Sequence, residues 1–247
     1  MKKGTPKGKR SWKRILLWTV VVLGLGGAVC SIWLQSQSYP VDQKAKQVLQ
    51  EAQVERVGGG LHFEAQKPRA TLIFYTGAFV NPESYSGLGK GLADGGVDVY
   101  ILSSPFNLPV LDGAHAKQLV EKEKIDLPSL YLGGHSLGGV MASRSAKDMN
   151  PAGLILLASY PDSKTDLSQT SLRVLSITAD QDQVMKEDAF REAQKRLPSN
   201  TSYVTIRGGN HSGFAWYGQQ KGDGQAAISQ EIQMREIVTQ ILAFTQE

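Results

Sequence analysis

The chain has 247 residues, which is enough for one α/β domain with a short extension but too short for two independent enzymatic domains. Its net charge of +4 and pI of about 9.0 would suit a nucleic-acid binder, but seven of its 27 basic residues fall within residues 1–14. The rest of the chain has 20 basic against 23 acidic side chains, a net charge of about −3, so it offers phosphates no basic surface. We therefore expect no nucleic-acid partner. Cys30 is the only cysteine, which excludes an intramolecular disulfide.

An apolar segment follows the basic tail of residues 1–14. Residues 15–34 contain no charged side chain in 20 positions, and a helix of that length spans roughly 30 Å, the thickness of a bilayer's hydrocarbon core. Trp12, Trp18 and Trp33 lie towards its ends, where aromatic rings favour the membrane interface. Because basic flanks stay in the cytoplasm, the pattern predicts a single-pass anchor in the cell membrane, with the chain after it outside the cytoplasm.

A cleaved signal peptide is the main alternative to this anchor. Such peptides have a shorter apolar stretch and a small-x-small exit, whereas the candidate Ala28-Val29-Cys30 lies inside the apolar run. A lipoprotein signal would need a small residue before Cys30, where Val29 stands. A buried core helix would leave the adjacent basic block unexplained. We favour the uncleaved anchor and leave cleavage open.

The remaining elements follow in chain order. Residues 35–53 are polar and are expected to form a spacer with at most one short helix, and residues 54–57 and 61–65 alternate around three glycines as in a hairpin. From residue 70, short apolar runs alternate with amphipathic stretches, which predicts an α/β domain over 54–247 with a mostly parallel sheet flanked by helices. We expect strands at 70–75, 97–103, 129–133, 153–160, 172–178 and 202–207, and helices near 82–94, 113–124, 137–149, 185–197 and 228–245, the last capped by Ser229. The connection from 160 to 172 leaves no room for a cap domain.

One motif carries a candidate nucleophile. Gly134-His135-Ser136-Leu137-Gly138 follows an apolar strand and directly precedes a helix. In this strand–turn–helix setting a serine stands on a strained turn at the carboxyl edge of the sheet, and small neighbours let helix and strand approach closely. The start of the helix also directs N–H groups at an oxyanion. The setting favours Ser136 as a nucleophile over an incidental serine in a glycine-rich turn.

A serine nucleophile needs a base, and in chains with this motif the base is a histidine that follows the serine. His62 and His115 precede Ser136, and we expect His135, beside the serine, to point elsewhere. Only His211 lies downstream, in a glycine-rich turn after the last expected strand. The order along the chain therefore predicts His211 as the base.

The acid that orients the base should follow an intervening strand. Asp180 and Asp182 both lie where the strand at 172–178 ends, and a short carboxylate there can reach a histidine without crossing the core. Asp182 lies deeper in the turn and precedes the apolar Val184, whereas Asp180 could cap the turn. We favour Asp182 and keep Asp180 as the alternative, with Asp162 a more distant candidate.

The remaining candidates concern the oxyanion and the substrate. The N–H of Leu137, which follows the nucleophile, should pair with an N–H from the loop after the first parallel strand. Gly77 permits a tight turn there, and Ala78 is the expected second donor. Loop aromatic residues are candidates to line the substrate site, namely Phe79, Phe214 and Trp216, with Phe106 and Tyr217 beside them.

These segments resemble the α/β-hydrolase superfamily and, more narrowly, are similar to the small bacterial alpha/beta hydrolase fold-5 group, which is related to dienelactone hydrolases. The resemblance covers about residues 54–245 and is carried by the segments at 75–78, 134–138, 179–182 and 208–211, and more specifically by 214–218 and 222–224. It implies a triad of Ser136, Asp182 and His211. Ala179 stands where relatives often have glycine, and Ser136 replaces the cysteine of dienelactone hydrolases, which argues against a true dienelactone hydrolase.

The sequence thus predicts a membrane-anchored serine hydrolase that resembles a carboxylesterase and acts on small-molecule or lipid esters. Its mechanism would proceed through an acyl-enzyme and would need no metal or cofactor. Two alternatives stay open: an acyltransferase that uses a lipid or cell-envelope acceptor, and a non-catalytic binding domain on a hydrolase scaffold.

Overall fold

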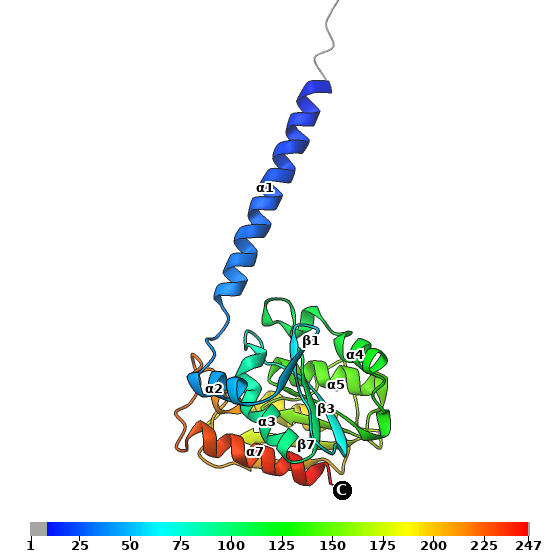
Figure 1. The fold of residues 1–247 in the computed structure, drawn as a ribbon. Helices are drawn as coiled ribbons and strands as arrows, with labels where there is room; N and C mark the ends of the chain where they lie inside the picture. Colours follow the sequence, from blue (N-terminus) through cyan, green and yellow to red (C-terminus); the bar gives the residue numbers. More distant parts are fainter. Residues whose placement is uncertain (1–8, 247) are drawn as a thin grey trace, which may run out of the picture. The chain divides into compact units, whose positions relative to one another are not determined.

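The computed structural model describes residues 9–246, and the chain divides into two compact units, Met1–Ser38 and Tyr39–Glu247 (Figure 1). The first unit contains helix α1 (Lys9–Ser36). Over Arg14–Ser36 the mean hydropathy of α1 reaches 2.3, and none of that stretch is buried in protein. Among the described helices, α1 alone is long and apolar enough to cross a membrane. Lys2, Lys3 and Lys7 of the basic tail lie outside the described residues.

The second unit begins before the expected domain start at residue 54. Helix α2 (Gln43–Glu51) is capped at its amino end by Asp42, whose carboxylate accepts the Lys44 N–H at 2.9 Å. Its apolar positions follow helical spacing, so Ala45 becomes fully buried. The Ser86 hydroxyl donates to the Ala45 carbonyl at 3.0 Å, which joins α2 to the next helix. Residues 39–53, which we assigned to a spacer, therefore pack with the α/β domain.

The core of this unit is one sheet of eight strands in the order β1-β2-β4-β3-β5-β6-β7-β8. The pairs β1–β2 and β2–β4 are antiparallel, and the pairs from β4 through β3, β5, β6 and β7 to β8 are parallel. The mostly parallel sheet predicted from the alternating pattern is thus confirmed. The strands are β1 (Val54–Val57), β2 (Gly60–Phe63), β3 (Ala70–Tyr75), β4 (Val97–Ile101), β5 (Leu130–His135), β6 (Gly153–Leu157), β7 (Arg173–Ala179) and β8 (Ser202–Ile206).

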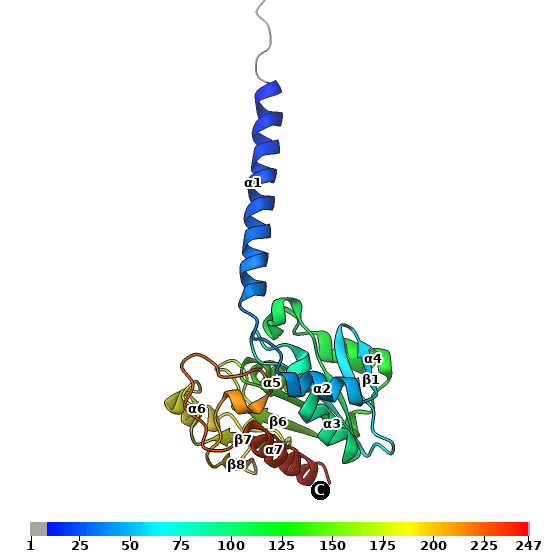
Figure 2. The same ribbon diagram turned by 60° about the vertical axis from the view of Figure 1, so that its left-hand side comes forward.

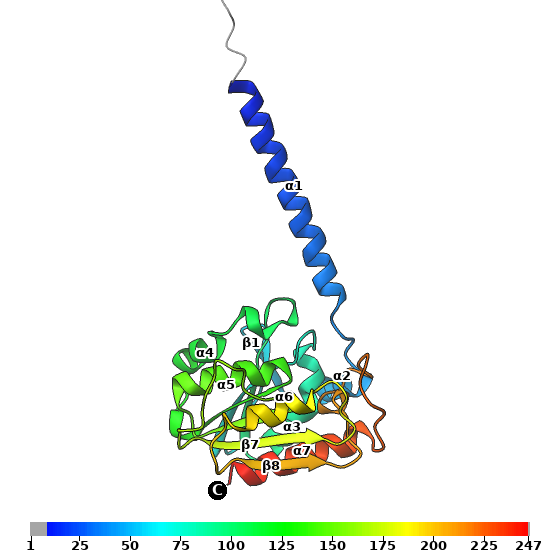
Figure 3. The same ribbon diagram turned by 180° about the vertical axis from the view of Figure 1, so that it is seen from behind.

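Helices cover both faces of the sheet, because alternate side chains of the buried strands point to opposite sides. On β3, Leu72 and Phe74 pack in one core cluster, and Ile73 and Tyr75 pack in another. The first cluster lies under α2, α3 (Ser86–Asp94) and α7 (Gln230–Phe244), which Figure 2 shows together. Figure 3 shows the other side, with α4 (His115–Glu123), α5 (Leu137–Met149) and α6 (Glu187–Gln194).

The boundaries of the helices and strands from β3 onward agree with those expected from the sequence to within a few residues. The expected helix at 82–94 is split, because Asn81 and Pro82 start a short 3₁₀ turn (Pro82–Tyr85) before α3. The Ser229 hydroxyl accepts the Ile232 N–H at 3.3 Å at the start of α7, which confirms the expected cap. Residues 158–172 between β6 and β7 contain no helix or strand, so no cap domain is inserted there.

Candidate active site

Ser136 lies in the turn between β5 and α5 with φ of 53° and ψ of −122°, a conformation that L-residues rarely adopt. The glycines around it explain how the turn closes. A Cβ on Gly134 would overlap the backbone of Gly138, and a Cβ on Gly138 would overlap the carbonyl oxygens of Tyr75 and Thr76. Strand and helix therefore approach more closely than any side chain would permit.

Three hydrogen bonds fix the strained backbone of Ser136. Its N–H donates to the Leu157 carbonyl at 2.9 Å, which ties it to the end of β6. Its carbonyl accepts the Ser159 hydroxyl at 2.6 Å and the Gly139 N–H at 3.0 Å. Such a backbone conformation costs about 1–3 kcal/mol and persists only where its surroundings determine it. Here the surroundings are the neighbouring strand and the first turn of α5.

The structure brings Asp182 to His211. Asp182 Oδ2 lies 2.7 Å from His211 Nδ1, and the side chains of the two residues are 1% and 2% exposed. Asp182 Oδ1 accepts the N–H groups of Val184 at 2.8 Å and Met185 at 2.9 Å. The carboxylate is thus held from both sides while the imidazole Nδ1–H donates to it.

The two other candidate acids have different partners. Asp180 is exposed, and its Oδ1 accepts the Gly208 N–H at 2.7 Å. Asp162 pairs with the guanidinium of Arg144 on α5 and accepts the Thr165 hydroxyl at 2.7 Å. Of the three carboxylates considered from the sequence, Asp182 is the one that bonds to the imidazole of His211.

Ser136 and His211 line the same cavity, which has a volume of about 250 Å³. Most of the other side chains around it are apolar, so the space favours an uncharged group. The lining residues are Ser136, Leu137, Val140, Ala158, Ser159, Tyr160, Val184, Met185 and His211. They come from the turn after β5 and the first turn of α5, and from the segments that follow β6, β7 and β8 at the carboxyl edge of the parallel strands.

The expected oxyanion donors lie in suitable surroundings. Leu137 is the first residue of α5 and lines the cavity. In the loop after β3, the Gly77 N–H donates to the Tyr85 hydroxyl at 2.8 Å and the Phe79 N–H donates to the Asn107 carbonyl at 2.7 Å. Between them, the N–H of Ala78 donates to no other described residue, and neither does that of Leu137. Leu137 lines the cavity beside Ser136, whereas Ala78 is not among the lining residues, so the role of Ala78 stays a prediction.

The structure corrects the expectation for two loop aromatics. Phe214 is fully buried and stacks on the ring of His135, with the ring centroids 5.6 Å apart. Trp216 is 8% exposed and packs over Gly87, where a Cβ would overlap its ring. Both belong to the core cluster under α3 and α7 and do not line the cavity, because their large apolar area is buried there. Phe79 is half-buried and also lies outside that lining.

His135, which we expected to point away from the nucleophile, does not line the cavity, but its ring packs against that of His211. Its ring centroid lies 4.7 Å from that of His211, and its Nδ1 lies 2.9 Å from the Tyr85 hydroxyl. Because that hydroxyl accepts the Gly77 N–H, its own proton goes to His135 Nδ1, which places the imidazole proton of His135 on Nε2. Burial lowers the pKa of His135 well below its usual value, and the neighbouring His211 lowers it further. His135 is therefore neutral at physiological pH.

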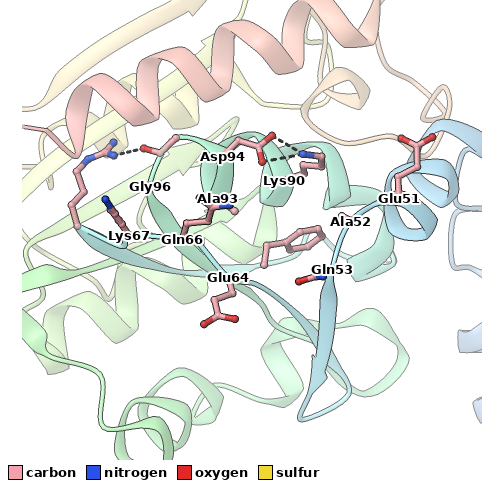
Figure 4. Close-up of a pocket in the computed structure, with 13 residues that line it drawn as sticks. Glu51, Ala52, Gln53, Glu64, Gln66, Lys67, Lys90, Ala93, Asp94 and Gly96 are labelled. Atoms are coloured by element: carbon pink, nitrogen blue, oxygen red, sulfur yellow. Dashed lines mark hydrogen bonds and ion pairs between the residues drawn. The ribbon is translucent and has the colours of Figure 1, made fainter.

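A larger cavity of about 800 Å³ lies at the opposite edge of the sheet (Figure 4). Its lining includes residues just before β3, such as Lys67, so it lies at the amino ends of the parallel strands. Ser136 follows β5, which runs parallel to β3, and therefore lies at their carboxyl ends. Three of its charged side chains bond within the lining of the larger cavity. Lys90 pairs with Asp94 at 2.7 Å, and Arg69 donates to the carbonyl of Gly95. This cavity thus brings no nucleophile and base together.

Comparison with known proteins gives the family. A model of the alpha/beta hydrolase family matches residues 71–235, more than half of the chain. The chain therefore belongs to the alpha/beta hydrolase family. No curated protein sequence gives a significant match.

Solved structures share the fold at low sequence identity. TT1662 from Thermus thermophilus is 16% identical, with a TM-score of 0.57 over 79% of this chain and 98% of that chain. LAE6, an alpha/beta hydrolase enzyme from the metagenome of Lake Arreo in Spain, is 18% identical, with a TM-score of 0.56 over 95% and 98%. A hyperthermophilic esterase from the archaeon Pyrobaculum calidifontis is 17% identical, with a TM-score of 0.53 over 88% and 90%. At these identities the likeness shows the fold alone.

The buried, neutral state of His135 predicts a pH-dependent stability. In the unfolded chain this histidine binds a proton as the pH falls through about 6.5, whereas in the folded chain its pKa is lower. Its contribution to the free energy of unfolding should therefore fall below that pH, by at most about 1.4 kcal/mol per pH unit. Urea unfolding of wild type and His135→Gln between pH 5 and 8 would measure the difference. The variant should lose part of the wild-type slope below pH 6.5, and an unchanged slope would contradict the prediction.

Proposed function

We propose that this member of the alpha/beta hydrolase family is a serine hydrolase with carboxylesterase-like activity. Ser136 is the nucleophile, His211 the base and Asp182 the acid that orients the base. One observation carries the proposal: His211 is hydrogen-bonded to a buried carboxylate and lines the same cavity as a serine on a strained turn. A binding domain would have no need of this combination.

The chemistry follows from these positions. His211 takes the proton of the Ser136 hydroxyl, and the oxygen attacks the acyl carbonyl of the ester. The N–H groups of Leu137 and Ala78 bind the resulting oxyanion, and the amino end of α5 adds positive potential there. His211 then protonates the departing alcohol, and a water molecule activated by His211 hydrolyses the acyl-enzyme. Asp182 holds Nδ1–H in place and stabilises the imidazolium that forms in each step.

The cavity beside Ser136 indicates the kind of acyl group. Its volume of about 250 Å³ lies just under the range of typical ligand pockets, and Leu137, Val140, Val184 and Met185 give it an apolar lining. We therefore propose an uncharged carboxylic ester with a short apolar acyl chain. The solved structures that share the fold include proteins described as esterases, which supports hydrolysis as the reaction.

We also propose that α1 anchors the enzyme in the cell membrane. The helix is apolar over Arg14–Ser36, and basic residues precede it in the sequence. The tendency of basic flanks to remain inside places the amino terminus in the cytoplasm and the hydrolase domain outside it.

A fluorophosphonate probe tests the nucleophile. It should label the purified full-length protein covalently, because an activated serine attacks its phosphorus. Labelling should disappear in Ser136→Ala and persist in Ser163→Ala, which removes an exposed hydroxyl outside the cavity. In-gel fluorescence measures the extent of labelling in each variant, and mass spectrometry of the labelled peptide identifies the labelled residue. A folded wild-type protein that takes no label would refute the proposal.

A pair of matched variants tests the acid. Asp182→Asn should lower kcat for a p-nitrophenyl ester by about 10⁴-fold, because the amide favours the wrong tautomer of the base. Asp180→Asn should leave kcat nearly unchanged, since an amide oxygen can still accept the Gly208 N–H. A large loss of kcat in Asp180→Asn together with a nearly unchanged kcat in Asp182→Asn would assign the acid to Asp180.

Protease accessibility tests the topology. Protease added to intact cells, or to spheroplasts where an outer barrier surrounds the cell, should degrade the hydrolase domain and leave a fragment that contains α1. A cytoplasmic control protein in the same sample should stay intact. Full protection of the domain while lysed cells show digestion would place it in the cytoplasm and overturn the proposed orientation.

A further inference from the structure

Asp223 collects five hydrogen bonds on one carboxylate, in the loop between β8 and α7. Its Oδ1 accepts the backbone N–H groups of Gln183 at 3.4 Å, His211 at 3.3 Å and Gly224 at 2.8 Å. Its Oδ2 accepts the N–H of Ser212 at 2.8 Å and the Ser212 hydroxyl at 2.7 Å. Each carboxylate oxygen therefore receives two or three donors.

The donors come from both sides of the Asp182–His211 hydrogen bond. Gln183 follows Asp182 in the turn after β7, and His211 and Ser212 belong to the loop after β8. The donors Gln183 and His211 are 28 positions apart in the sequence. A single carboxylate thus joins the backbone of the base to the backbone next to the acid.

The Asp223 loop is itself anchored. The Ser212 hydroxyl that donates to Asp223 also accepts the Gln220 N–H at 2.8 Å. The Asn210 side-chain amide donates to the Gly224 carbonyl at 2.8 Å, and Gly224 packs so tightly that a Cβ would overlap the Gln181 carbonyl oxygen. The backbone that carries the Asp223 carboxylate is therefore fixed in position.

All five partners are donors, so the group between them must be an acceptor throughout. An ionised carboxylate offers two oxygens and no proton, and its hydrogen bonds to backbone N–H groups are charge-assisted. An asparagine would keep one oxygen and turn an NH₂ group towards the donors on the other side, leaving those donors without an acceptor. The arrangement selects aspartate at position 223 on chemical grounds.

We propose that Asp223 is a positioning residue of the catalytic site. It sets the distance and the angle between the carboxylate of Asp182 and the imidazole of His211, and through them the direction of Nε2 towards Ser136. The proposal rests on the serine-hydrolase function proposed above. A displacement of the reacting groups by about 1 Å costs on the order of 10²-fold in rate, so the alignment supplied by Asp223 belongs to turnover rather than to substrate binding.

The test compares Asp223→Asn with wild type in the full-length protein. We expect kcat for a p-nitrophenyl ester to fall by about 10²-fold while KM stays nearly constant, because the apolar cavity does not include Asp223. The downfield proton resonance of His211 Nδ1–H in the wild-type protein should shift or broaden in the variant. Fluorophosphonate labelling should slow but still reach Ser136.

Asp162→Asn is the matched control. Asp162 is also a loop carboxylate with several donors, since it accepts the Lys164 N–H at 3.2 Å and the Thr165 hydroxyl at 2.7 Å and pairs with Arg144. Its partners include neither the acid nor the base of the site. This variant should keep the kcat and the imidazole proton resonance of wild type. Equal losses in both variants would show a general effect of loop carboxylates and would overturn the proposal.

Two further outcomes separate the proposals. If the probe labels wild type and Asp223→Asn at the same rate, with kcat and the resonance unchanged, the positioning role is refuted while the hydrolase function stands. If wild type takes no label, the hydrolase function itself has failed. Should Asp223→Asn not fold, Ser212→Ala keeps the carboxylate and removes one of its donors, together with the acceptor of the Gln220 N–H. It should lower kcat by a smaller factor at constant KM, and an unchanged kcat there would also refute the role.

Discussion

The backbone of Ser136 is the constraint on which the rest of the site depends. Its φ of 53° places the side chain at the tip of the turn between β5 and α5, at a cost of about 1–3 kcal/mol. The turn is held because strand and helix touch through glycine backbones and because Leu157 and Ser159 at the end of β6 bond to the serine backbone. The hydrogen bonds to the neighbouring strand thus offset the strain. A Gly-x-Ser-x-Gly pattern outside such a sheet would lack these bonds.

The order of the strands then decides which loops can reach the serine. β5 has β6, β7 and β8 on one side, all parallel, so the turns after these strands meet at the same edge of the sheet. Asp182 follows β7 and His211 follows β8, and both must reach back towards β5 across the intervening strand ends. Loops that extend this far have no ladder of their own, so side chains fix them: the Asp182 carboxylate, the Asp180–Gly208 bond and the five donors on Asp223.

The contrast between strands held by backbone ladders and loops held by side chains explains what the sequence could and could not predict. Strands and helices leave periodic patterns, so the sheet, its helices and the cap at Ser229 could be read from the residues alone. Chain order indicated His211, but it left Asp180 open beside the favoured Asp182, and it is the structure that shows which carboxylate bonds to His211. The aromatics of the loop after β8 have no periodicity, so the sequence did not indicate that Phe214 and Trp216 enter the core. Contacts between residues far apart in the sequence, such as that of Asp223 with Gln183, leave no local signal at all.

The site must also keep two buried imidazoles, with ring centroids 4.7 Å apart, from competing for the same proton. Their partners make them different. His211 donates from Nδ1 to a carboxylate, which leaves Nε2 as the acceptor that a base needs. His135 accepts at Nδ1 from Tyr85, whose hydroxyl is committed in turn by the Gly77 N–H, so a second proton on His135 would break this chain of donors. Burial also lowers the pKa of His135, because a charged imidazole would lose its hydration there. The loop after β3 thereby helps to keep the imidazole next to His211 uncharged.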